Sequence, residues 1–149
     1  MPHAVSRLRA ARLLRATKPF VARGGSRHAH CPDCRLVPSH CLCAEHPRVA
    51  TRAGICLLMS DLEPLKPSNT GWPVADAIDD TFAFGWARME TDPALLALLE
   101  DPQWQPFVVF PAEYADAGRV VRAVQAADLH PVADAKRPLF VLLDGTWSE

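Results

Sequence analysis

Four cysteines form two closely spaced pairs in the first third of the chain. Cys31 and Cys34 are separated by two residues, and Cys41 and Cys43 by one. Each pair can turn two sulfurs toward one metal ion, and together they supply the four thiolates of a tetrahedral Zn²⁺ site. The segment is rich in proline and polar residues, so metal binding would supply folding energy that apolar burial cannot. The spacing predicts a structural zinc knuckle.

The sequence leaves other chemical states open for these four cysteines. An iron–sulfur cluster also takes four thiolates, and the cysteines could remain unbound. Disulfides are disfavoured by a setting that looks intracellular. His28, His30, His40 and His46 lie close by, and one of them could replace a cysteine as a ligand. Cys56 lies in an apolar run and is expected to be a core thiol.

A second group of residues that could form a catalytic or binding site follows the apolar run 139–143. Five consecutive apolar residues are typical of a strand buried on both faces. Asp144, Gly145, Thr146 and Trp147 come next and combine an acid, a flexible glycine, a hydroxyl and a large aromatic ring. This turn is a candidate site. The alternative is that Asp144 only forms a turn and that Trp147 belongs to the core.

A third group lies in the loop 63–71, which follows the apolar run 54–59 and precedes an expected helix. Its candidate residues are Lys66, Ser68, Asn69, Thr70 and Gly71. Hydroxyl and amide groups at a helix N-terminus favour an anion such as a carboxylate or phosphate, and the lysine adds a positive charge. The alternative is that these polar side chains merely cap the helix.

The elements that must position these groups alternate between strand and helix. Expected strands cover 54–59, 81–86, 107–110 and 139–143, and expected helices cover 74–78, a segment beginning at Asp92, and roughly 113–127. This alternation predicts an α/β fold with a mainly parallel, three-layer sheet.

Ligands bind at the carboxyl edge of such sheets, because the strand tips and helix N-termini converge there. The loop 63–71 and the turn at Asp144 both leave strands at that edge, so we expect them to face a common pocket. Arg88, after the second strand, would bring a cation to the same edge and bind a carboxylate bidentately. It could equally be a solvated surface charge.

The composition is that of a globular protein, with 49% hydrophobic and 22% charged residues. No apolar run approaches the roughly 20 residues needed to cross a bilayer, and the N-terminus lacks the apolar centre of a secretory signal. We expect a soluble, cytoplasmic protein with no membrane contact and no obligate protein partner.

Positive charge is concentrated at the N-terminus. Residues 1–30 carry seven basic and no acidic side chains, whereas the remainder carries nine basic and seventeen acidic ones. Such a segment can contact the phosphates of a nucleic acid, although a solvated tail or an organellar presequence has a similar composition. A short amphipathic helix is expected over residues 5–15.

We therefore divide the chain into three parts: a basic, flexible arm over 1–27, a zinc-binding knuckle over 28–47, and a partial α/β domain over 48–149. The last strand delivers a turn to a site only a few residues before Glu149. A site strand that stops so soon suggests a fragment of a longer domain.

With these residues in place, the sequence resembles the DTW-domain family of tRNA-uridine aminocarboxypropyltransferases. The resemblance covers residues 31–149. The matching motifs, in the family's order, are the two cysteine pairs, the loop 63–71, the Trp86-Ala87-Arg88 strand end and the Asp144-Gly145-Thr146-Trp147 turn.

The resemblance implies transfer of the 3-amino-3-carboxypropyl group from S-adenosylmethionine to N3 of a uridine in tRNA. It also implies a fold related to knotted RNA methyltransferases, in which the C-terminal part would lie beyond this chain. The catalytic residues would be Asp144, Thr146 and Trp147, with Asp144 as the general base for the N3 proton.

The co-substrate S-adenosylmethionine would then be bound by the loop 63–71 and Arg88, with its methionine carboxylate over the turn at residues 68–70. Two other functions fit the same residues. One is a zinc-containing RNA-binding module without catalysis, and the other is an S-adenosylmethionine-dependent RNA methyltransferase.

Overall fold

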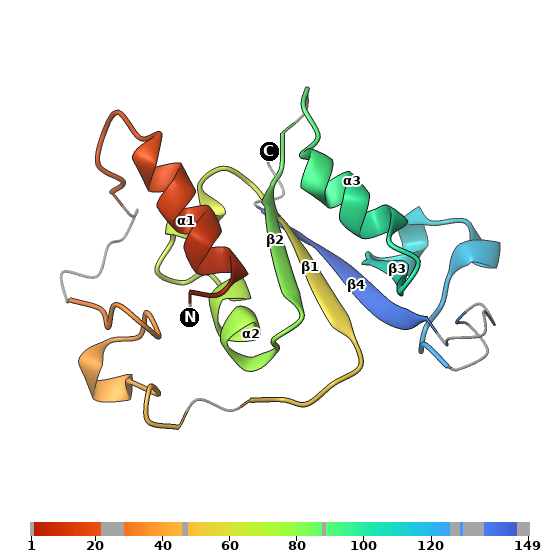
Figure 1. Cartoon of the computed structure of the whole chain (residues 1–149), viewed down its shortest axis with the longest axis horizontal. Helices are drawn as coiled ribbons and strands as arrows, with labels where there is room; N and C mark the ends of the chain where they lie inside the picture. Colours follow the sequence, from red (N-terminus) through yellow and green to blue (C-terminus); the bar gives the residue numbers. More distant parts are fainter. Residues whose placement is uncertain are drawn as a thin grey trace.

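The structure is a computed structural model of the whole chain, and it describes residues 2–21, 29–45, 48–87, 89–125, 129 and 136–145. Its centre is one sheet of four strands (Figure 1). The strands are β1 (Gly54–Met59), β2 (Thr81–Gly85), β3 (Trp104–Val109) and β4 (Arg137–Asp144).

The strands lie in the order β2-β1-β4-β3, and every pair is parallel. The predicted parallel α/β sheet is therefore confirmed. Because β4 lies beside β1, the last strand in the chain ends next to the first. The register pairs Met59 with Asp144, so these two strand ends share one edge of the sheet.

Helix α3 (Pro93–Glu100) covers one face of the sheet. As predicted, it begins after Asp92, whose side chain accepts a hydrogen bond from the Ala94 N–H at 2.9 Å. Leu95 and Leu98 pack into a core with residues of the strands. The other members of this core are Cys56, Leu58, Trp104, Leu139 and Val141.

Helices α1 (Ala4–Leu14) and α2 (Gly71–Ala77) cover the opposite face, as Figure 1 shows. Successive strand residues point to opposite faces, so Leu57 and Met59 join this second core while their neighbours join the first. Val5 of α1 has no exposed surface and packs into the same cluster. Three layers result, as the alternation of elements predicts.

The basic N-terminal segment thus contributes a helix to the domain. The helix expected over 5–15 is confirmed as α1. Arg12 ties it to the loop after β1, because its Nε and Nη2 atoms each donate to an Asp61 carboxylate oxygen at 2.7 Å. Leu8 of this helix packs against the core, whereas Leu14 is 89% exposed.

The helix expected over 113–127 is wrong for the described residues up to 125. Two short 3₁₀ turns, Ala112–Tyr114 and Ala117–Arg119, stand in its place. Gly118 and three β-branched valines lower helix propensity there, and the described residues of the segment have no buried face to offset that cost. Residues 126–127 of this prediction lie outside the described residues.

Element ends differ from the prediction by a few residues. β3 begins at Trp104, earlier than expected, and β4 extends from Arg137 to Asp144. Further 3₁₀ turns are η1 (Pro38–His40) and η2 (Glu63–Leu65). None of the helices in the described residues has the length and apolar character that crossing a membrane requires.

Candidate functional site

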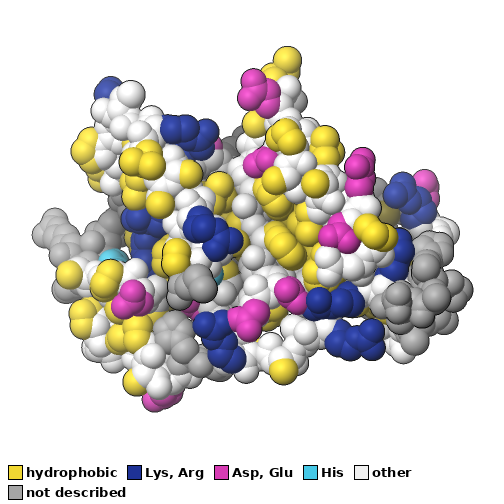
Figure 2. All heavy atoms as spheres, in the orientation of Figure 1, with side chains coloured by type: hydrophobic (Ala, Val, Ile, Leu, Met, Phe, Trp, Pro, Cys, Tyr) yellow, Lys and Arg dark blue, Asp and Glu magenta, His cyan; other side chains and the backbone are white. Residues whose placement is uncertain are grey.

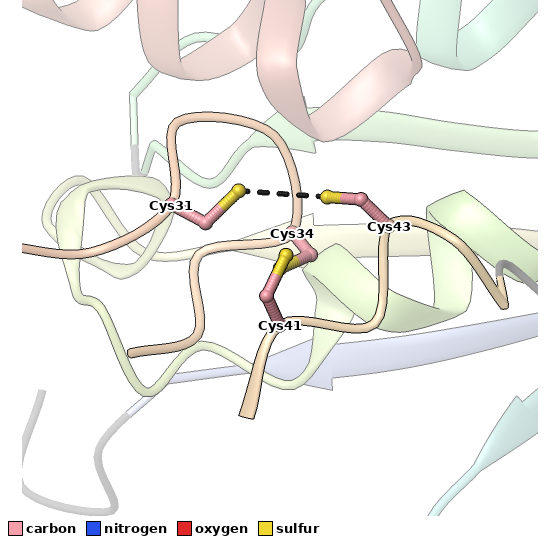
Figure 3. Close-up of side chains that lie close together, drawn as sticks. All are labelled: Cys31, Cys34, Cys41 and Cys43. Atoms are coloured by element: carbon pink, nitrogen blue, oxygen red, sulfur yellow. Dashed lines mark hydrogen bonds between the residues drawn. The ribbon is translucent and has the colours of Figure 1, made fainter. Parts of the chain in front are cut away.

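The four paired cysteines converge on one point in space (Figure 3). Their sulfur atoms all lie within 4.8 Å of one another. The Cys31 and Cys43 sulfurs are 3.5 Å apart, and the Cys34 and Cys41 sulfurs are 3.8 Å apart. A tetrahedral site with Zn–S bonds of about 2.3 Å separates its sulfurs by about 3.8 Å. The four cysteines can therefore hold one metal ion, and their spacing is consistent with zinc.

Backbone hydrogen bonds shape the first cysteine pair. The Cys31 N–H donates to the Leu36 carbonyl at 2.8 Å, and the Arg35 N–H donates to the Cys31 carbonyl at 3.0 Å. Backbone N–H groups, chiefly that of Leu36, also lower the pKa of Cys34 to about 6. A thiolate that forms easily suits metal binding, because the thiolate is the ligand.

The alternatives for the cysteines can now be weighed. All five cysteines are free thiols. Sulfurs this close leave room for a single ion, whereas an iron–sulfur cluster places two or more irons between them. His30 and His40 are not in the metal-binding group, and His28 and His46 lie outside the described residues. Cys56 is fully buried in the core, as expected, and burial raises the pKa of its thiol to about 11.

A second cluster lies where β1 and β4 end. The Asn69 side-chain amide donates to Asp144 Oδ2 at 2.8 Å across 75 positions of sequence. The Ser60 N–H donates to the Asp144 carbonyl at 2.8 Å, which ties the start of the β1 loop to the end of β4. The expected meeting of the loop 63–71 with the turn at Asp144 therefore takes place.

Gly71 lies at the closest approach between these elements. A Cβ atom at this position would be 2.9 Å from Leu57 Cδ1 and 3.4 Å from Asp144 Oδ2. A larger residue would press against Leu57 and against Asn69 Oδ1, 3.1 Å away, whereas Asp144 would be at an ordinary contact distance. The glycine therefore leaves room for the Asn69 side chain that donates to Asp144.

The electrostatic surroundings of Asp144 favour its neutral form. Burial raises the pKa of Asp144, and the charge of Glu63 acts in the same direction. The hydrogen bond from Asn69 and the charge of Lys66 oppose these effects. Lys66 is itself paired with Glu63, which is buried. Asp144 is thus a carboxyl group with an elevated pKa beside a second acid and a lysine.

Two buried polar atoms beside Asp144 have no hydrogen-bond partner among the described residues. They are Asn69 Oδ1 and Ser60 Oγ. Unsatisfied buried acceptors are rare, because each forfeits the hydrogen bonds that water would provide. Both atoms can accept a hydrogen bond from an N–H or O–H group of a ligand at this edge.

The remaining predicted site residues have varied positions. Ser68 and Thr70 are exposed. Thr70 precedes α2 but its side chain makes no capping hydrogen bond, so helix capping does not explain this residue. Arg88, Thr146 and Trp147 lie outside the described residues, and their roles stay predictions.

Sequence reasoning missed Glu63 and Ser60 as members of this cluster. The spacing of Glu63 and Lys66, three residues apart, is a signal for their ion pair. No comparable signal marks Ser60, which reaches the site only because β4 lies beside β1.

The two clusters are joined through Trp72. Its indole N–H donates to the Asp33 carbonyl in the cysteine segment at 2.7 Å. The Arg35 guanidinium lies over the indole ring, 5.2 Å from its centroid. Trp72 follows Gly71 directly in the sequence, so α2 connects the cysteine segment to the loop that contacts Asp144.

A parallel three-layer sheet with a polar site at its carboxyl edge and an attached four-cysteine knuckle defines an α/β protein with a metal-binding module. The family model of the DTW domain matches residues 28–149, and the chain belongs to this family, as the sequence motifs indicated. The DTW domain is associated with tRNA-modifying enzymes. No solved structure matches the chain.

Proposed function

We propose that the chain transfers the 3-amino-3-carboxypropyl group of S-adenosylmethionine to N3 of a uridine in tRNA. The observation that carries this proposal is the Asp144 carboxyl group at the end of β4, held by Asn69 and raised in pKa by burial. Membership of the DTW-domain family supports tRNA as the substrate class.

Asp144 is suited to be the general base. Uridine N3–H is a weak acid and must lose its proton before N3 can attack carbon. A base works best when its pKa lies near the operating pH, and burial moves the pKa of Asp144 in that direction. The hydrogen bond from Asn69 fixes one carboxylate oxygen and leaves the other for the N3 proton.

In the transfer step, the N3 proton passes to Asp144 and the N3 lone pair forms a bond to the terminal carbon of the aminocarboxypropyl chain. The bond between that carbon and the sulfonium breaks, and its electron pair stays on sulfur. The sulfonium already activates the carbon, so the protein mainly has to position the two reactants.

The loop 63–71 would hold the amino acid end of the co-substrate. Asn69 Oδ1 and Ser60 Oγ are buried acceptors that fit an ammonium group. Lys66 supplies a positive charge for a carboxylate, with the hydroxyls of Ser68 and Thr70 exposed close by. Arg88, Thr146 and Trp147 keep the cofactor-binding and catalytic roles that the family resemblance implies.

We assign the metal a structural role. The cysteine segment contacts α2 through Trp72, and no described residue of that segment forms a hydrogen bond or an ion pair with Asp144. A bound zinc ion would fold the segment so that it presents Asp33 and Arg35 to the indole ring.

The test is an assay on unmodified tRNA with S-adenosylmethionine labelled either in its methyl group or in its carboxyl carbon. We expect carboxyl label to enter the RNA and methyl label to stay out. Entry of methyl label alone would establish a methyltransferase instead. If neither label enters while the RNA still binds, the chain is a non-catalytic zinc-containing RNA-binding module.

A further inference from the structure

Arg35 adopts a backbone conformation that normally belongs to glycine. Its φ is 65°, and it is the only non-glycine residue with positive φ in the described part of the chain. Glycine would make the same turn after Cys34 without steric cost. The turn therefore does not explain why an arginine stands here, and its side chain must supply the reason.

The Arg35 side chain meets a second arginine, from α1. Arg9 follows Val5 by four residues on the same side of α1, and Val5 belongs to the same buried cluster as Trp72, the residue over which Arg35 lies. The positive charge of Arg9 accordingly lowers the pKa of Arg35, after the larger effect of burial. Burial also lowers the pKa of Arg9. Two partly buried guanidinium groups that repel one another are a costly arrangement unless an anion lies between them.

Neither arginine has an acidic partner among the described residues. Other arginines of the protein do, since Arg12 pairs with Asp61, Arg48 with Asp79 and Arg137 with Asp80. Arg9 Nε is moreover buried and donates to no acceptor in the described part of the chain. A buried charged donor without an acceptor points to a group that the protein binds.

Both arginines belong to segments that pack against the rest of the domain. Arg35 lies over the Trp72 ring, and Arg9 belongs to a helix whose Val5 is fully buried. Figure 2 shows Lys and Arg side chains along α1 on this face of the molecule. Trp72 also connects the pair to Gly71 and thus to Asp144.

Stacking of Arg35 on Trp72 is the simplest structural explanation, and cation–π contacts of this kind are common. It accounts for one arginine only. It leaves the buried Arg9 Nε unsatisfied and the two like charges together. A phosphate satisfies both, because guanidinium groups bind phosphate oxygens bidentately.

We propose that Arg9 and Arg35 together bind one backbone phosphate of the RNA substrate, with α1 supplying one side of the site and the cysteine knuckle the other. The choice of RNA as the phosphate donor rests on the proposed function. Since Arg35 lies in the knuckle, the metal would support RNA binding by holding this arginine in place.

The test measures binding of unmodified tRNA as a function of salt, without S-adenosylmethionine, so its outcome is separate from that of the transfer reaction. We expect Arg9→Ala and Arg35→Ala each to weaken binding about tenfold. The double variant should be much less than a hundredfold weaker, because both residues hold the same phosphate. Its salt dependence should fall by about one unit of slope.

Arg122→Ala is the matched control, since it removes one exposed charge far along the sequence. Equal losses for Arg122→Ala, or additive losses in the double variant, would overturn the proposal. Arg35→Lys keeps the charge and tests the same contact if Arg35→Ala fails to hold zinc, and it should weaken binding while retaining the salt slope.

A second test uses inorganic phosphate in place of RNA. It should raise the melting temperature of the wild type and leave that of the Arg9→Ala, Arg35→Ala double variant unchanged. If phosphate stabilises the wild type while all variants bind tRNA equally, the site serves a free anion and the assignment to RNA is wrong.

Discussion

The cysteine knuckle and the parallel sheet differ in what they bury. Over residues 29–45 no hydrophobic side chain is buried, whereas the sheet buries apolar side chains on both faces, with Met59 and Leu139 fully enclosed. The knuckle has four close sulfurs and two contacts to Trp72 in place of a core. One chain thus stabilises a small part through ligands and a large part through apolar burial, and the two parts should fail under different treatments.

Metal removal should have the largest effect, and it should be local. Structural zinc contributes an apparent 10–16 kcal/mol in small zinc-binding peptides, roughly the whole stability of such a segment. We expect a chelator, or Cys34→Ser, to abolish hydrogen-exchange protection in residues 29–45 and to leave β1 and β4 protected.

The control for this experiment is Cys56→Ala, which should keep the metal content unchanged because Cys56 lies in the core. Equal loss of protection in the knuckle and in the sheet would contradict the division between the two parts.

A substitution in the sheet should destabilise the sheet and leave the metal site of the knuckle intact. A Cβ at position 54 would lie 2.7 Å from two atoms of the Trp104 ring, which is itself buried and has little room to move. Gly54→Ala should lower the free energy of unfolding by about 1–3 kcal/mol through overpacking, with zinc content unchanged.

Gly118→Ala is the matched control for Gly54→Ala, since nothing lies within 4 Å of its added Cβ. Chemical denaturation of the two variants side by side measures the difference. Similar stability of both variants would show that the Trp104 contact is not restrictive.

Weakening the contact between the knuckle and the sheet, which is made through Trp72, should have a smaller effect. Trp72→Phe removes the hydrogen bond to the Asp33 carbonyl and keeps an aromatic ring beneath Arg35. A lost hydrogen bond of this kind costs about 0.5–1.5 kcal/mol, so zinc release to a chelator should become roughly two- to tenfold faster. Trp86→Phe is the control, because Trp86 is exposed. Equal rates of zinc release for both variants would contradict a role of Trp72 in holding the knuckle.

The pH dependence of stability should change least. Because burial raises the pKa of Asp144, the folded chain holds this proton more tightly than the unfolded chain. The stability that it contributes is full below the unfolded pKa of about 3.9 and is lost as pH rises through the folded pKa.

Asp144→Asn removes this titration, so the variant should gain stability relative to the wild type over that pH range. The carboxylate is only partly buried, and solvent screening keeps the gain below about 1 kcal/mol. Urea titrations across the acidic range measure it. A relative stability that falls with rising pH would contradict the raised pKa.

Local patterns in the sequence predicted most of the sheet. Apolar runs placed β1 and β4, and Asp92 with the following proline fixed the start of α3. The helix expected from 113 does not form over the described residues, because an apolar pattern alone does not provide a surface to pack on. The cysteine spacing predicted the metal cluster because four thiolates so close in sequence have few other arrangements.

Local sequence patterns could not predict the contacts between distant segments. The sequence predicted a site at the carboxyl edge of the sheet. Which residues meet there depends on β4 lying next to β1. Burial of Glu63 and of Val5 depends on how α1 and the loop pack together, which no local spacing encodes. The approach of α1 to Arg35 in the knuckle likewise depends on both segments packing on Trp72.

The most direct test of the central claim is the single-turnover rate of transfer to tRNA by Asp144→Asn, with Asp116→Asn as an exposed control. If Asp144 removes the N3 proton, the rate should fall roughly a hundred- to ten-thousandfold while tRNA binding stays the same. An Asp144→Asn variant that transfers the group at the wild-type rate would show that Asp144 is not the base.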